Sequence, residues 1–184
     1  MDPHSDLLDE AETIAALGRE LGLEFIVVGA LALAAHHYVR STGDVDLAGV
    51  VSLDKLHDFK DRLQQSGYDV ELRLPDADDP LGGVLDIHHE EGLIQLISFA
   101  DRFPGVIRDA LQEAKLTLSE RGTLPIVPLA HLVVLKLYAG GLKSKADVVE
   151  VLSRNPDADL NAIEALCEGY RIRGFEEIRR ELRA

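Results

Sequence analysis

The sequence predicts an α+β fold, in which a mixed β-sheet flanked by helices is followed by a small C-terminal helical bundle. Over residues 1–127, amphipathic helical periodicity alternates with short β-branched runs. Over residues 128–184 only helical segments occur, separated by Gly-Gly, Asn-Pro and Gly breaks. We therefore expect an α/β domain over 1–127 and a helical lobe over 128–184 that packs against it.

Size and charge limit the class of protein. The chain has 184 residues and 46% hydrophobic residues, enough for one domain with an apolar core and a small appended lobe. The formal net charge is -14, which disfavours a protein whose main task is to grip phosphate backbones non-specifically. A small basic patch on an acidic body remains compatible with this charge.

Cysteine use and hydropathy predict a cytoplasmic location. Cys167 is the single cysteine, which excludes an intrachain disulfide framework and a zinc site built from cysteines. The N-terminus is acidic, unlike a signal peptide. The most apolar run, Phe25–Ala35, is shorter than the roughly 20 residues of a spanning helix. We therefore expect no membrane association.

The elements of the first domain are predicted from their local patterns. Helical spacing and Ala-rich composition predict helices over Asp6–Leu21, Ala30–His37 and Ser52–Gln65, the last capped by Ser52. Apolar or alternating runs predict strands over Phe25–Val28, Asp44–Val51 and Tyr68–Leu72.

The second half of this domain contains a predicted hairpin. Val84–His89 and Leu93–Ser98 flank a turn at Glu90-Glu91-Gly92, after a loop at Leu74–Pro80. A helix is expected from Pro104, because proline suits the first helical position, and a short strand pair over Leu116–Val127. The helical lobe is expected to contain four segments: Leu129–Tyr138, Lys145–Leu152, Asp159–Cys167 and Phe175–Leu182.

Two aspartates form the candidate site for chemistry. Asp44 and Asp46 stand two residues apart on a predicted strand, so both side chains point to one face. Neighbouring carboxylates repel each other unless a cation lies between them, and Mg²⁺ prefers oxygen ligands. Gly29 ends the preceding strand and allows a tight turn, after which helix N-terminal amides could receive a phosphate. This combination is typical of phosphoryl or nucleotidyl transfer.

The same segment resembles the nucleotidyltransferase superfamily, which has the DNA polymerase β-like fold. The similarity rests on Val28-Gly29-Ala30 followed by Asp44-Val45-Asp46-Leu47, and on Arg40 and Thr42 just before the aspartates. Together with the two aspartates, Arg40 and Thr42 resemble the Arg-x-Thr-x-Asp-x-Asp variant of this motif. That variant is common in the AbiEii-type toxin branch and its uncharacterised bacterial relatives.

A downstream segment extends the resemblance to residues 22–152. Leu129–Leu152 is similar to the Leu-x-x-Leu-Lys-Leu-x-Ala helix and the following acidic helix of those relatives. The matching residues in this chain are Lys136, Ala139, Lys145, Asp147 and Glu150.

The resemblance implies a function and a set of site residues. It implies transfer of NMP from an NTP to an acceptor hydroxyl, on a tRNA end or a protein side chain, with Mg²⁺ held by Asp44 and Asp46. It also implies a toxin role in a toxin–antitoxin system, with an antitoxin protein as partner. The nucleotide-binding residues would be Gly29, Ala30, Arg40, Thr42, Lys136 and Asp147.

The chain departs from the family pattern at the third carboxylate. Gln95 stands where the family places an aspartate on a later strand, and glutamine is a neutral ligand and a poor general base. If the hairpin turns on Glu90-Glu91 alone, Asp86 lies opposite Gln95 and supplies the missing catalytic carboxylate. If Gly92 joins the loop, the register changes and this compensation fails.

The departure leaves two alternatives open. One is an active enzyme that uses Asp44, Asp46 and Asp86. The other is a catalytically degenerate relative that binds a nucleotide or a partner protein without turnover. Lys136 is equally compatible with contact to phosphate and with a structural ion pair to Asp147.

Overall fold

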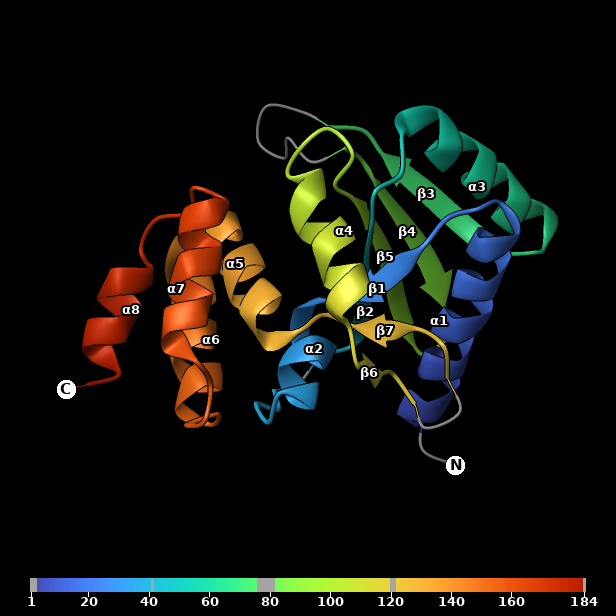
Figure 1. Ribbon diagram of the computed structural model, residues 1–184. Helices are drawn as coiled ribbons and strands as arrows, with labels where there is room; N and C mark the ends of the chain where they lie inside the picture. Colours follow the sequence, from blue (N-terminus) through green and yellow to red (C-terminus); the bar gives the residue numbers. More distant parts are fainter. Residues whose placement is uncertain (1–2, 41, 76–81, 120–121, 184) are drawn as a thin grey trace.

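The computed structural model describes residues 3–40, 42–75, 82–119 and 122–183 (Figure 1). The helices are α1 (Pro3–Glu20), α2 (Gly29–Ala35), α3 (Leu53–Gln65), α4 (Pro104–Glu113), α5 (Leu129–Ala139), α6 (Gly141–Ser153), α7 (Leu160–Gly169) and α8 (Phe175–Glu181). The strands are β1 (Phe25–Val27), β2 (Asp44–Gly49), β3 (Asp69–Arg73), β4 (Val84–His89), β5 (Gly92–Ser98), β6 (Leu116–Thr117) and β7 (Pro125–Ile126).

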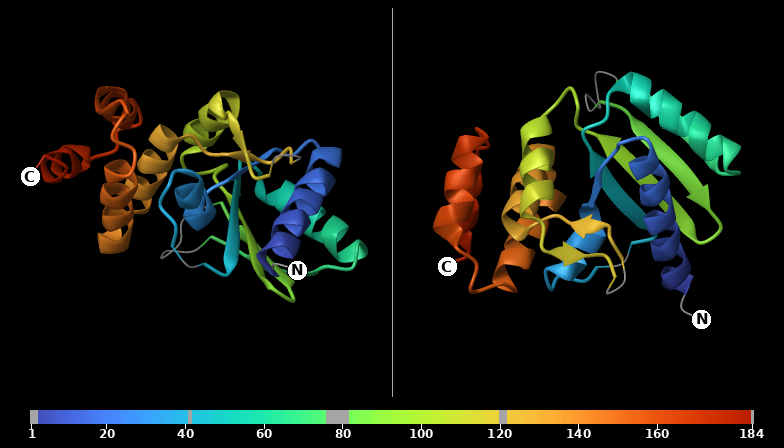
Figure 2. Two further views of the ribbon diagram at one scale, coloured as in Figure 1. Left: turned by 90° about the horizontal axis from the view of Figure 1, so that it is seen from below. Right: turned by 45° about the vertical axis from the view of Figure 1, so that its right-hand side comes forward.

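These strands form one mixed sheet in the order β3-β4-β5-β2-β1-β7-β6. The pairs β2–β5 and β1–β7 are parallel, whereas β1–β2, β3–β4, β4–β5 and β6–β7 are antiparallel. Helices α1 and α3 lie side by side against one face of the sheet (Figures 1 and 2). The predicted α+β fold, with a mixed sheet flanked by helices and a run of helices after it, is confirmed.

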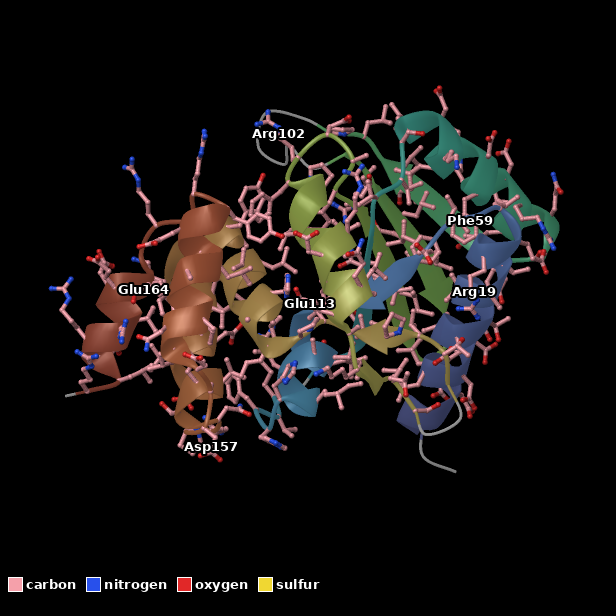
Figure 3. All side chains as sticks on the ribbon, in the orientation of Figure 1. Arg19, Phe59, Arg102, Glu113, Asp157 and Glu164 are labelled. Carbon is pink, nitrogen blue, oxygen red and sulfur yellow. The ribbon has the colours of Figure 1, made fainter. Side chains whose placement is uncertain are left out.

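The two faces of the sheet differ in chemistry. The face toward α1 and α3 is apolar: Val45, Leu47, Leu85, Ile94 and Leu96 are all buried. The side chain of Phe59 on α3, labelled in Figure 3, packs toward this face, and its ring centroid lies 5.5 Å from that of Phe25 on β1. Because strand side chains alternate, residues 44, 46, 86 and 95 point to the opposite face, which carries the polar residues of interest.

The turn after α2 connects the sheet to the C-terminal helices. His36 Nε2 lies 2.8 Å from the carbonyl oxygen of Val127, at the end of β7. Asn155, just after α6, donates from Nδ2 to the carbonyl oxygen of His36 at 2.7 Å. Helices α5 to α8 lie together on one side of the sheet (Figure 1). The division into domains at residues 127 and 128 stays a prediction.

The sequence located the elements well, with some corrections. The hairpin pairs Asp86 with Gln95 and His89 with Gly92, so the turn on Glu90-Glu91 is confirmed. Ser52 occupies the N-cap of α3, as predicted, although its side chain makes no capping hydrogen bond.

One helix differs in extent, and one predicted loop is only partly described. Helix α6 begins at Gly141, earlier than predicted, and the predicted loop Leu74–Pro80 falls partly outside the described residues.

Among the described residues, no helix is both long and apolar enough to cross a bilayer.

We predict that Leu96→Ala destabilises the protein strongly. Leu96 lies fully buried in β5, an interior strand of the sheet, so truncation removes apolar contacts and leaves a cavity. The free energy of unfolding, measured in urea, should fall by about 3 kcal/mol.

The matched control is Leu142→Ala, because Leu142 is 89% exposed. This change should alter the free energy of unfolding by less than about 0.5 kcal/mol. Equal losses in the two variants would contradict the assignment of the core.

Candidate active site

The two aspartates lie together at the start of β2. Asp44 is exposed and Asp46 is half-buried, and their side chains share the face of the sheet that α1 and α3 leave uncovered. The backbone N–H of Val28 donates to the carbonyl oxygen of Asp46 at 2.9 Å, and that of Ala30 donates to the Asp46 carboxylate. The turn that connects β1 to α2 thus holds Asp46 in place. The role of Ala30 beneath a phosphate stays a prediction.

Gly29 makes the close approach of this turn to Asp46 possible. Its φ is +67°, in the left-handed region. A Cβ at this position would lie 1.8 Å from Asp46 Oδ2 and 2.7 Å from Asp46 Cγ. Glycine is therefore required here both by backbone conformation and by the contact with the catalytic candidate.

The electrostatics around Asp46 favour a bound cation. Burial raises the pKa of Asp46 above its usual value, and the charge of Asp44 raises it further. The charges of Lys136 and Arg40 and the Ala30 hydrogen bond oppose this rise in pKa without cancelling it. A divalent ion between the two carboxylates would relieve their repulsion. Asp44 and Asp46 therefore fit Mg²⁺ in the chemistry of their donor atoms.

A pocket of about 180 Å³ adjoins Asp46. It is lined by Val28, Gly29, Asp46, Ile97, Phe99, Leu132, Leu135, Lys136, Ala139 and Ser144. Asp46 and Lys136 line this space from the sheet and from α5, while most other lining residues are apolar. A few convergent charges within apolar walls are typical of a ligand site.

The buried carboxylate of Asp147 and the half-buried side chains of Lys136 and Arg40 form a charge network beside the pocket. Lys136 Nζ donates to Asp147 Oδ2 at 2.7 Å, and Arg40 Nη2 lies 3.9 Å from the same oxygen. Asp147, on α6, is only 4% exposed. The structural ion pair between Lys136 and Asp147 is thus formed, and it places two cations near Asp46. Nucleotide binding by these residues stays a prediction.

Asp86 belongs to a second charge network on the same face of the sheet. Arg73 donates to it from Nε at 2.5 Å and from Nη2 at 3.2 Å, and Gln95 donates from Nε2 at 2.6 Å. Burial alone would raise the pKa of Asp86, but the Arg73 and Gln95 hydrogen bonds and the Arg73 charge hold that pKa below its usual value. Asp86 is therefore an anion near neutral pH and a poor proton acceptor.

The structure brings some predicted residues together and separates others. Gly29, Asp46 and Lys136 line one pocket, whereas Thr42 is engaged locally, since its hydroxyl accepts from the backbone N–H of Asp44 at 3.3 Å. No group of three or more His, Cys, Asp or Glu side chains in the described part of the chain could hold a metal ion. Asp86 therefore shares the face of Asp44 and Asp46 without forming a carboxylate triad with them.

Sequence reasoning missed Arg73 and the apolar pocket walls. Arg73 lies diagonally across β3 and β4 from Asp86, a neighbour relation that depends on the register of that pair. A basic residue at alternating spacing in a strand next to the hairpin is the signal that could have identified it. The lining residues Phe99 and Leu132 carry no local signal, because they lie far apart in sequence.

The comparisons identify the fold. No family model and no curated protein matches the sequence. Similar solved structures include ANT(2″)-Ia in complex with adenylyl-2″-tobramycin, with a TM-score of 0.57 and 15% identity over 90% of this chain and 97% of that chain.

A second structure of ANT(2″)-Ia, an antibiotic-resistance factor, has a TM-score of 0.55 and 15% identity over 93% of each chain. An antigenic nucleotidyltransferase-like protein from Paracoccidioides brasiliensis has a TM-score of 0.51 and 17% identity over 84% of this chain and 77% of that chain. The chain therefore shares the nucleotidyltransferase fold.

We predict that Gly29→Ala disrupts the site, whereas Gly22→Ala does not. Both glycines have φ near +70°, so both variants are strained by about 1 kcal/mol or more. Only the Cβ at residue 29 meets Asp46, because nothing lies within 4 Å of a Cβ at residue 22.

Urea denaturation should show the larger loss of stability for Gly29→Ala. If the chain binds an NTP with Mg²⁺ as the resemblance implies, displacement of Asp46 should also weaken that binding about tenfold to a hundredfold in that variant alone, measured by calorimetric titration. Equal nucleotide binding by the two variants would contradict the proposed contact.

We predict that Asp46→Asn stabilises the protein at neutral pH in the absence of metal. The pKa of Asp46 is raised in the folded state, so the folded protein binds this proton more tightly than the unfolded chain. Ionisation of Asp46 therefore costs stability above the folded-state pKa, and that cost disappears as the pH falls below the unfolded value.

Urea denaturation in chelator from pH 7 to pH 4 provides the measurement. The free energy of unfolding of Asp46→Asn should exceed that of wild type at pH 7, and the difference should shrink on acidification. A difference that grows as the pH falls would show that Asp46 has a lowered pKa instead.

Proposed function

We propose that this protein is a Mg²⁺-dependent nucleotidyltransferase that transfers NMP from an NTP to an acceptor hydroxyl. The observation that carries the proposal is the placement of Asp44 and Asp46 on one face of β2, with Asp46 and Lys136 facing a common pocket. The shared nucleotidyltransferase fold supports it.

Each residue of the site has a role in this reaction. Mg²⁺ bound to Asp44 and Asp46 would polarise the α-phosphate and orient the triphosphate. Lys136 contacts a phosphate at the pocket edge, in competition with its present partner Asp147, and Arg40 adds a second positive charge. The bond from the acceptor oxygen to the α-phosphorus forms as the bond to pyrophosphate breaks, and the proton of the acceptor hydroxyl passes to solvent water. Asp86, on β4, contributes a negative charge beside the site and does not accept a proton.

The acceptor is proposed from the resemblance to the AbiEii-type branch. A tRNA end or a protein side chain would supply the hydroxyl, and the net charge of -14 favours the protein side chain, since phosphate backbones are repelled. The ANT(2″)-Ia complex contains adenylyl-2″-tobramycin, so tobramycin belongs in any panel of acceptors tested. A toxin role with an antitoxin protein as partner rests on the same resemblance.

A degenerate site is the second candidate function. Gln95 occupies the position expected for the third carboxylate, and the described residues contain no three-carboxylate metal group. A protein of this kind would bind a nucleotide or a partner protein without turnover. Binding and turnover therefore have to be measured separately.

The test is calorimetric titration of wild type with each of ATP, GTP, CTP and UTP in Mg²⁺. We expect binding with a dissociation constant between about 1 µM and 1 mM. The variant Asp44→Asn/Asp46→Asn should lose this binding.

The control is Asp54→Asn/Asp58→Asn on α3, which makes the same change in charge at exposed positions and should keep the binding. Release of pyrophosphate in the presence of acceptors then separates the two candidates. An absence of NTP binding by wild type would contradict both the enzyme and the nucleotide-binding alternative.

A further inference from the structure

Gln95 lies between two carboxylates in one row across the sheet. It pairs in register with Asp46 on β2 on one side and with Asp86 on β4 on the other. Residues paired in register share a face, and adjacent strands are about 4.8 Å apart. The amide of Gln95 thus stands directly between the candidate metal ligand Asp46 and the ion-paired Asp86.

The chemistry of Asp86 fixes the orientation of the Gln95 amide. Arg73 binds both oxygens of Asp86 and keeps the carboxylate ionised. An ionised carboxylate only accepts hydrogen bonds, so the nitrogen of the Gln95 amide has to face it, and Nε2 donates to Asp86 Oδ1 at 2.6 Å. The carbonyl oxygen Oε1 is thereby left on the side away from Asp86, where Asp46 is in register.

We propose that the carbonyl oxygen of Gln95 replaces the third carboxylate as a ligand of the bound metal. Asp86, held by Arg73, is then a positioning residue that prevents the amide from turning over. This inference rests on the proposed function and specifies how that site works without a third acidic ligand. An amide oxygen is a neutral and weaker ligand, so the metal should bind together with the triphosphate, whose oxygens supply the missing charge.

The arrangement makes the effect of Asp86 conditional on Gln95. In Asp86→Asn, Arg73 holds the carbonyl oxygen of the new side chain, so its amide nitrogen faces Gln95. Gln95 then has to accept this hydrogen bond through Oε1, and its NH₂ group is presented to the metal site. The metal should be bound poorly in this variant, although residue 86 does not touch it.

A double-mutant cycle tests the inference with the Mg²⁺ complex of a non-hydrolysable α,β-methylene NTP analogue as the probe. Gln95→Met and Asp86→Asn should each weaken binding of this complex about tenfold to a hundredfold, as loss of a ligand or of its orienting partner does. The double variant should bind no more weakly than Gln95→Met. Gln95→Asp, which restores the third carboxylate, should bind the complex more tightly than wild type.

The outcomes separate this inference from the proposed function. Binding that needs Asp46 but is unchanged in Gln95→Met would overturn the inference and leave the function intact. Asp86→Asn could also weaken binding of the complex equally whether residue 95 is Gln or Met. That result would make Asp86 itself the ligand and would also overturn the inference. No binding by wild type would contradict the proposed function and the inference together.

An NMR measurement keeps the inference testable if Asp86→Asn folds poorly. The side-chain NH₂ signals of Gln95, assigned by their absence in Gln95→Met, should shift when the Mg²⁺ complex of the analogue binds. They should remain unshifted in Asp46→Asn. Gln95 signals that do not respond in wild type, although the complex binds, would overturn the inference.

Discussion

The site depends on the contact between the Asp46 carboxylate and the backbone at Gly29. Asp46 lies on β2, and the turn that leaves β1 passes so close to it that a Cβ on Gly29 would overlap Oδ2. The N–H groups of Val28 and Ala30 bind Asp46 through its carbonyl oxygen and its carboxylate. A carboxylate held on one side by the backbone can present its other side to a ligand. The pairing of β1 with β2 therefore builds the site as well as the sheet.

The C-terminal helices complete this site electrostatically. Helix α5 brings Lys136 to the pocket, and α6 brings Asp147, which is buried and therefore needs cationic partners. Arg40, just before β2, reaches the same carboxylate from the sheet side. A triphosphate would compete with Asp147 for these two cations. The helical lobe is thus a functional part of the site in our proposal.

Local patterns predicted most of the fold and part of the site. Alternation in DVDL was enough to place Asp44 and Asp46 on one face. The sequence left open whether the turn after Val84–His89 has two residues or three, and the structure has the two-residue turn that pairs Asp86 with Gln95. The sequence could not show that Arg73 neutralises Asp86, because that contact depends on how β3 and β4 are aligned. The pocket walls from α5 were equally hidden, since they depend on packing between distant segments.

The row of residues across the sheet explains why a glutamine suits position 95. Asp46, Asp86 and Glu71 lie in register on β2, β4 and β3, so an acid at residue 95 would create an unbroken row of four carboxylates. Such a row would raise the pKa of its members and disfavour the ionised site before a metal arrives. The Gln95 amide interrupts the row and donates to Asp86, and in our proposal it turns its oxygen toward Asp46. Arg73 neutralises Asp86, and the charges of Asp44 and Asp46 are left for the metal and its nucleotide.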